Sequence, residues 1–264
     1  MTRVVVCNQK GGVAKTTTLL TLARCLAGQG KRVLIIDTDP QGSVHSTLGL
    51  KPEKFLDHLV RQNHVFDSCL TPVRDNIHLI ASNRDTSATE AFLMGMPGRE
   101  LVLRHLFSQF EQAYDVVLID SAPSISLVQA CAMVYAQTLL IPVNMDTLAL
   151  QGAMMCIQSA QLMNELYHMQ IRTAAFLPVM MDRRYQMTAL TLQSLEQYAQ
   201  RFRIPILQSI RTDSAIPKAA RARQFLADYD PKSKALEDYI AAADQLVEIT
   251  NGQVQPAEAH AALT

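Results

Sequence analysis

Short runs of apolar residues alternate along the chain with longer stretches in which apolar residues recur every three or four positions. A compact apolar run is typical of a buried strand, and the longer spacing is typical of a helix with one buried face. The runs predict strands at residues 4–7, 32–37, 77–80, 115–120, 138–143, 173–179 and 204–207. The helical spacing predicts helices at residues 15–28, 99–112, 148–168, 187–201 and 234–249.

Continuous apolar strands that alternate with helices indicate the fold class. Strands without a polar face must be covered on both sides, which is typical of parallel sheets. We therefore expect an α/β fold: a single-domain, doubly wound, mostly parallel sheet with helices on both faces. Residues 1–250 are predicted to form this domain, since no linker rich in Pro, Gly or Ser interrupts them. The polar, alanine-rich segment 251–264 has no periodicity and is predicted to be a disordered C-terminal tail.

The bulk composition says more about the compartment than about the function. Lys plus Arg is 24 and Asp plus Glu is 24, so the net charge indicates neither a nucleic-acid nor a membrane partner. The five cysteines are dispersed without a CxxC pair, which favours buried reduced thiols. The N-terminus lacks a signal-peptide pattern, and no apolar run reaches the roughly 18 residues that a membrane helix needs. These features predict a cytoplasmic protein.

A glycine-rich loop joins the first predicted strand to the first predicted helix. In such folds the N–H groups of the loop and the dipole of the helix bind phosphates. Lys15 is expected to reach the β- and γ-phosphates, Thr16 to offer its hydroxyl to Mg²⁺, and Thr17 to donate to the α-phosphate. The residues predicted to bind nucleotide in this loop are Gly11, Gly12, Val13, Ala14, Lys15, Thr16 and Thr17.

The loop departs from the ordinary P-loop pattern, G-x-x-x-x-G-K-[ST], because Gln9 and Ala14 stand at its glycine positions. The pattern present is K-G-G-x-x-K-T-T. It resembles the deviant P-loop of the ParA/MinD ATPases, whose extra signature lysine corresponds to Lys10. If the position of Ala14 requires a positive φ, alanine strains the loop by roughly 1 kcal/mol.

Acidic residues follow two of the predicted strands. The switch I motif of the ParA family, D-x-D-P-Q-G-N, resembles the stretch from Asp37 to Ser43. This resemblance implies that Asp39 orients or activates the attacking water and that Asp37 lies near the Mg²⁺ shell. Asp120 ends an apolar strand and suits a Walker B carboxylate, which holds Mg²⁺ directly or through water. The family form is h-h-h-h-D-x-P-P, and Ala122 replaces its first proline.

The resemblance to the ParA family extends from about residue 2 to about residue 240. It includes Ile141-Pro142-Val143, Leu150-x-Gly152 and residues 229–234. The chain is similar to the small ParA/Soj-type ATPases, which implies slow Mg²⁺-dependent ATP hydrolysis and a homodimer that forms face to face around two ATP molecules. In that dimer Lys10 would reach the partner's phosphates. Pro217 lies in a loose match to the family segment that flanks the adenine.

Basic residues exceed acidic ones between residues 182 and 223, where eight Arg and Lys residues stand against three acids. Such a local excess is typical of binding to the phosphate backbone, and a solvated helix face is the alternative. Arg184 and Arg211 lie approximately where Soj-like proteins carry DNA-contacting arginines. The residues predicted to bind DNA without sequence preference are Arg183, Arg184, Arg211, Lys218, Arg221 and Arg223.

The C-terminal residues 252–264 contain no Lys, no Arg and no large apolar face, which argues against the membrane helix of MinD-type relatives. We therefore expect a nucleoid-associated ATPase that positions or segregates a chromosome, a plasmid or a protein assembly. A ParB-like or cargo-adaptor protein would stimulate its hydrolysis. Open alternatives are a nucleotide-locked DNA-binding or regulatory switch with negligible turnover, a MinD-like ATPase on a membrane or scaffold, and a metabolic relative with the same P-loop.

Overall fold

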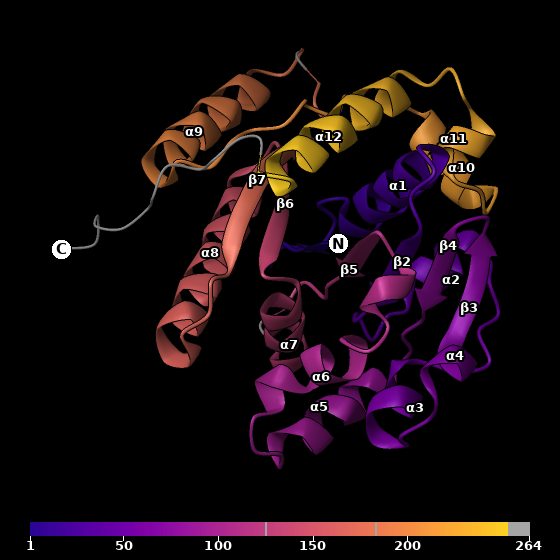
Figure 1. The fold of residues 1–264 in the computed structure, drawn as a ribbon. Helices are drawn as coiled ribbons and strands as arrows, with labels where there is room; N and C mark the ends of the chain where they lie inside the picture. The colour runs from indigo at the N-terminus through magenta and orange to yellow at the C-terminus, as the bar shows by residue number, and fades with distance from the viewer. Residues whose placement is uncertain (125, 183, 253–264) are drawn as a thin grey trace.

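The computed structural model describes residues 1–124, 126–182 and 184–252, so Arg183 and the predicted tail from residue 253 lie outside the described residues. Within the described part, the chain builds a seven-stranded sheet in the order β3-β4-β2-β5-β1-β6-β7 (Figure 1). The strands are β1 (Thr2–Val6), β2 (Val33–Asp37), β3 (Leu70–Arg74), β4 (Ile77–Ile80), β5 (Val116–Asp120), β6 (Thr138–Asn144) and β7 (Arg172–Val179).

The sheet is parallel except at one edge, where β3 pairs antiparallel with β4. The prediction of a mostly parallel sheet is therefore confirmed. Strand β3 was not predicted, because its sequence, Leu-Thr-Pro-Val-Arg, mixes polar residues and a proline into a short run. An edge position tolerates this composition, since only one side of an edge strand needs a complete hydrogen-bond ladder.

Helices cover both faces of the sheet, as predicted (Figure 1). Helices α1 and α12, with α2, α10 and α11, bury one core cluster, while α7 and α8, with α3 to α6 and α9, bury the other. The helices are α1 (Lys15–Gly28), α2 (Ser43–Leu48), α3 (Leu56–Arg61), α4 (Phe66–Cys69), α5 (Thr86–Met94), α6 (Val102–Phe107), α7 (Leu127–Ala136), α8 (Thr147–Tyr167), α9 (Gln186–Phe202), α10 (Ala215–Arg221), α11 (Leu226–Tyr229) and α12 (Lys234–Thr250).

The predicted strand at residues 204–207 is wrong, because this segment forms only an isolated bridge to β7. The N–H of Phe176 on β7 donates to the Pro205 carbonyl, and the N–H of Leu207 donates to the Phe176 carbonyl, each over 2.9 Å. The next residue of β7 that faces the same side is Pro178, which has no N–H to donate. Its carbonyl accepts from the N–H of Ile210 at 2.8 Å. Hydrogen bonding to β7 therefore resumes only after a gap, and no continuous strand forms.

The predicted helix at residues 99–112 is also wrong in its length, since only α6 and two short 3₁₀ turns form there. The Ser108 hydroxyl donates to the His105 carbonyl at 3.2 Å and so competes with continuation of the helix. Helix α7 was missed because it is apolar on nearly every side and lacks a polar stripe. The cysteines are free, as expected, and all but the partly exposed Cys25 are buried.

Candidate functional site

The loop between β1 and α1 has the backbone geometry of an anion site. Gly12 (φ 73°) and Ala14 (φ 58°) both lie in the left-handed region, so Ala14 does occupy the strained conformation considered from the sequence. Helix α1 begins without a side-chain cap and without an acidic residue in its first turn. Its first N–H groups are therefore available to a phosphate.

The Lys15 side chain is buried and folds back over this loop. Its Nζ donates to the carbonyl oxygens of Asn8 and Lys10, at 3.1 Å each. Burial lowers the pKa of Lys15, while the carboxylates of Asp120 and Asp39 oppose that shift. A phosphate would offer this ammonium charged oxygens in place of carbonyl dipoles, and charge-assisted hydrogen bonds are the stronger kind.

Two of the predicted metal ligands end neighbouring strands. Asp37 on β2 stands in register with Asp120 on β5, and both are buried. The Thr16 hydroxyl donates to Asp120 Oδ2 at 2.6 Å, which joins the start of α1 to this pair. The structure therefore brings together Thr16, Asp37 and Asp120, the three residues predicted to lie around Mg²⁺.

The Asp120 carboxylate fits a cation-binding role. Its Oδ1 atom is buried without a hydrogen-bond partner among the described residues. Burial raises its pKa to about 7 although Thr16 and Lys15 counteract the shift, and burial raises the pKa of Asp37 as well. A divalent cation would satisfy this oxygen. The described residues contain no cluster of three or more His, Cys, Asp or Glu side chains arranged for a metal.

The predicted switch I loop is folded by its own aspartates. Asp37 accepts the N–H groups of Asp39 at 2.9 Å and Val44 at 3.2 Å, one on each carboxylate oxygen. Asp39 in turn accepts the N–H of Gln41 at 2.9 Å. Gly42 is left-handed, and a Cβ there would lie 2.6 Å from the carbonyl oxygen of Ser82. Asp39 is thus held beside the Lys15 ammonium and the Asp120 carboxylate, whose pKa values both respond to it.

Lys10 is engaged within its own chain. Its ammonium forms an ion pair with Asp146, whose side chain also caps α8 by accepting the N–H of Ala149 at 2.9 Å. The Lys10 N–H donates to Asn8 Oδ1 at 2.9 Å. A Cβ on Gly152 would lie 2.3 Å from that same oxygen, so only glycine lets α8 approach the loop this closely.

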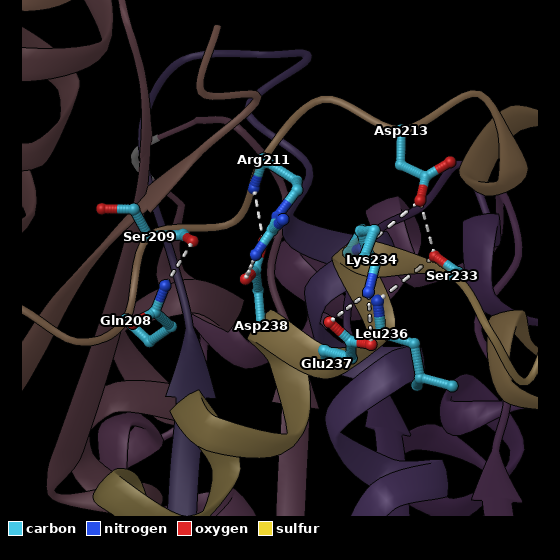
Figure 2. Close-up of polar contacts among 10 residues, drawn as sticks. Gln208, Ser209, Arg211, Asp213, Ser233, Lys234, Leu236, Glu237 and Asp238 are labelled. Atoms are coloured by element: carbon cyan, nitrogen blue, oxygen red, sulfur yellow. Dashed lines mark hydrogen bonds and ion pairs between the residues drawn. The ribbon is translucent and has the colours of Figure 1, made fainter. Parts of the chain in front are cut away.

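Pro217, the residue predicted near the adenine, lies on the exposed side of α10. The segment that leads into α10 is anchored to α12, because Asp213 Oδ2 accepts the Ser233 hydroxyl at 2.8 Å (Figure 2). Helix α12 is in turn tied to α1 by a 3.1 Å hydrogen bond between Tyr239 and Thr18. The segment thus belongs to the layer that carries the P-loop helix.

The predicted DNA-binding residues fall into two groups instead of one. Arg184 and Arg211 line a groove of about 790 Å³ beside the end of β7, and each is paired with an aspartate. Lys218 and Arg221 are exposed on α10. Arg223 follows α10 and packs over Gly49, where a Cβ would lie 2.4 Å from its Cδ atom. The structure describes no position for Arg183.

A family model described as an AAA domain matches residues 1–173. The sporulation initiation inhibitor protein Soj of Bacillus subtilis is 30% identical over 253 residues, which cover 92% of this chain and 97% of Soj. The chromosome partitioning protein ParA of Myxococcus xanthus is 27% identical over 92% of this chain and 87% of its own. The chain belongs to the ParA/Soj family of P-loop ATPases.

Solved structures agree with this ParA/Soj fold. Apo McdA from Cyanothece superposes with a TM-score of 0.83 over 94% of this chain and 99% of its own, at 22% identity. A cobyrinic acid a,c-diamide synthase from Mycobacterium smegmatis, with bound ATP analog and magnesium, gives 0.82 at 26% identity over 96% of this chain and 97% of its own. Nucleotide and magnesium are therefore used among the structural relatives of this chain.

Sequence reasoning missed the residues that fix the P-loop against β6 and α8. Asn8 is fully buried, and its amide donates to the carbonyls of Pro142 at 2.8 Å and Ala149 at 3.1 Å. Asp146 could have been predicted as a helix cap, since an Asp precedes the helical pattern of α8. Its pairing with Lys10 joins positions 136 residues apart and has no local signal. In the described part of the chain no helix is both long and apolar enough to cross a membrane.

Proposed function

We propose that this ParA/Soj-type protein is a Mg²⁺-dependent ATPase that uses ATP to control its association with itself, with DNA and with a cargo adaptor. The observation that carries the proposal is the convergence of Lys15, Thr16 and Asp120 at the carboxyl edge of β1 and β5. An ammonium, a hydroxyl and a carboxylate with an unsatisfied oxygen are the groups that phosphate and Mg²⁺ require.

The residues divide the chemistry among them. The phosphates would lie against the N–H groups of residues 11–17, with Lys15 neutralising the β- and γ-phosphates. Thr16 and Asp120 would hold Mg²⁺, which withdraws charge from the phosphates when bound. Asp37 would lie beside this Mg²⁺ site, with each of its carboxylate oxygens held by one backbone N–H group. Asp39 would orient the attacking water.

Lys10 supplies the proposed link between nucleotide and dimerisation. Its ammonium is neutralised by Asp146 within the chain. Contact with the phosphates of a partner subunit would exchange this carboxylate for another anion, so the charge on Lys10 stays compensated. The dimer would therefore form only when ATP provides the second anion.

Partitioning or positioning is the proposed biological role. The names of the Soj and ParA relatives support this role. The exposed Arg184, Lys218 and Arg221 support nucleoid DNA as the surface on which the dimer moves. A ParB-like or cargo-adaptor protein would stimulate hydrolysis and release the dimer, and the cargo would be a chromosome, a plasmid or a protein assembly.

The diamide synthase neighbour supports a second candidate, an ATP-dependent reaction on a cobyrinic acid substrate. Its phosphate site would be the same. The two candidates differ in what turnover requires, because a partitioning ATPase hydrolyses ATP without an acid substrate.

ATP turnover of three proteins tests the proposal: wild type, Asp39→Ala and the control Asp67→Ala, which alters an exposed aspartate on α4. We expect Asp39→Ala to bind ATP normally and to lose about a hundredfold in turnover, since only the positioning of water is removed. The control should match wild type. Turnover that depends on added cobyrinic acid would favour the synthase, and tight ATP binding without turnover in wild type would favour the nucleotide-locked switch.

A further inference from the structure

Two arginines of the groove beside β7 are held in different ways. The side chain of Arg184 is 84% exposed and pairs with Asp182, two residues earlier in the same loop. The side chain of Arg211 is 50% exposed and pairs with Asp238, which lies on α12 (Figure 2). The first pair can rearrange with its loop, whereas the second joins two separate segments of the fold.

The Asp238 carboxylate accepts hydrogen bonds from one edge of the Arg211 guanidinium. Nε and Nη2 of the guanidinium donate to its two oxygens, at 2.7 Å each, and the Arg211 backbone N–H adds a third hydrogen bond at 3.0 Å. A guanidinium has five N–H donors in a planar fork. The side-on pair therefore leaves Nη1 and one N–H of Nη2 for another acceptor.

Asp238 cannot follow Arg211 if that side chain moves. Its own side chain is only 4% exposed. The next residue on α12, Tyr239, is fully buried and bonds to Thr18 of α1, so this part of α12 is fixed against the P-loop helix. The carboxylate is thus a fixed point within the core layer.

A DNA phosphate could recruit Arg211 by breaking this pair or by using the free edge. Breaking it would leave a buried carboxylate without its counter-ion, which is strongly unfavourable. Binding at the free edge keeps the pair and needs no rearrangement. We propose that Asp238 is a positioning residue that fixes Arg211 so that its free guanidinium edge binds a DNA phosphate in the groove, an inference that rests on the DNA binding proposed above.

Charge alone predicts the opposite effect of removing Asp238. Asp238→Asn deletes a negative charge near the phosphate, which by itself would tighten DNA binding. Under the positioning role it should loosen binding, because an amide cannot accept from Nε, Nη2 and the backbone N–H as the carboxylate does. The adjacent Glu237→Gln is the matched control, since it deletes the same charge from the same helix but contacts Lys234 and not Arg211.

The experiment is a salt series of DNA binding by the full chain with ATP, on two duplexes of unrelated sequence. We expect Asp238→Asn and Arg211→Ala each to weaken binding about tenfold, the value of one charged hydrogen-bond contact. Each should also lower the salt slope by about 0.9, the contribution of one phosphate. Glu237→Gln should bind at least as tightly as wild type, and ATP affinity should stay unchanged throughout.

Two further variants separate positioning from a general disturbance of the fold. The double variant Arg211→Ala with Asp238→Asn should bind DNA no more weakly than Arg211→Ala alone. Arg211→Lys keeps the charge on a half-exposed side chain but loses the fork, so it should lose as much affinity as Arg211→Ala. Wild-type affinity in Arg211→Ala, Arg211→Lys or Asp238→Asn would overturn this inference alone. Failure of the wild type to bind either duplex would overturn the proposed DNA binding together with it.

Discussion

Two charged regions of this molecule hold their residues in opposite ways. The nucleotide edge is the proposed phosphate and Mg²⁺ site at the carboxyl ends of β1, β2 and β5, and the basic surface is formed by the exposed basic residues beside β7 and on α10. At the edge, Lys15, Asp37 and Asp120 are buried, and backbone groups and strand ends set their positions. On the surface, Arg184 and Lys218 are exposed and contact nearby polar side chains. Substitutions of the buried charged residues should therefore abolish nucleotide binding or turnover almost completely, whatever the salt concentration. Substitutions on the surface should weaken DNA binding only partly, by an amount that depends on ionic strength.

The largest effect is expected for Lys15→Ala. It removes the buried ammonium that would meet the β- and γ-phosphates, so ATP binding should be lost at every salt concentration. Equilibrium titration with ATP measures this, and Lys31→Ala, at an exposed lysine after α1, is the control. If Lys15→Ala bound ATP with wild-type affinity, the loop would not be the phosphate site.

Lys10 is the proposed link between nucleotide and dimerisation, and paired substitutions test this role. Lys10→Ala should bind ATP as a monomer and fail to dimerise, because the charge that reaches the partner subunit is gone. Asp146→Asn keeps a cap for α8 but releases Lys10, so it should dimerise at lower ATP concentrations than wild type. Size-exclusion chromatography over a range of ATP concentrations measures both. If Lys10→Ala dimerised normally with ATP, Lys10 would have no role in dimerisation.

Asp120→Asn should stabilise the protein without nucleotide while it impairs Mg²⁺-dependent turnover. Burial raises the folded-state pKa of Asp120 to about 7, whereas the pKa of this carboxyl in the unfolded chain is about 3.9. The unfolded state then binds fewer protons, so wild-type stability falls as pH rises from about 4 to about 7. The Tm advantage of Asp120→Asn should grow across that window, by about 2–4 °C for each kcal/mol. A variant that is less stable than wild type at pH 7 would contradict the cost assigned to burying Asp120 with its Oδ1 atom unsatisfied.

The smallest effect is expected at Ala14, where the edge itself carries strain. Ala14→Gly relieves a left-handed alanine of roughly 1 kcal/mol, so Tm should rise by about 2–4 °C. Gly28→Ala, within α1 at an ordinary φ, gives the reverse exchange for comparison. A lower Tm for Ala14→Gly would mean that the Ala14 methyl group packs better than its backbone conformation costs.

The nucleotide edge could be predicted from sequence because its residues sit at fixed offsets from strand ends. In a parallel sheet those ends meet at one edge, and this rule is enough to place Thr16, Asp37 and Asp120 close together. Asn8, Asp146 and Gly152 escaped prediction as a cluster, since the approach of α8 to the loop depends on the packing of the whole layer. The fold likewise separates features that local sequence predicts from features that depend on tertiary packing.

Strands with continuous apolar runs were predicted, whereas the edge strand β3 was not. At β3 the polar composition hid a strand, and at residues 204–207 an apolar run failed to become one because Pro178 interrupts the ladder from the other side. The division of the basic residues into two groups likewise follows from where α10 and the end of β7 lie in space. A sum of charges along the sequence cannot reveal it.

DNA binding by the Asp39→Ala protein, with and without ATP and over a range of salt concentrations, tests the proposed ATP-dependent binding to nucleoid DNA. We predict binding that requires ATP, since only the dimer would present two copies of the basic surface. We also predict equal affinity for unrelated duplexes, and a log–log salt slope that gains about −0.9 for each phosphate neutralised. Flat salt dependence, or no binding to any duplex at low salt, would contradict this proposal and favour a membrane or protein scaffold as the surface that this ATPase uses.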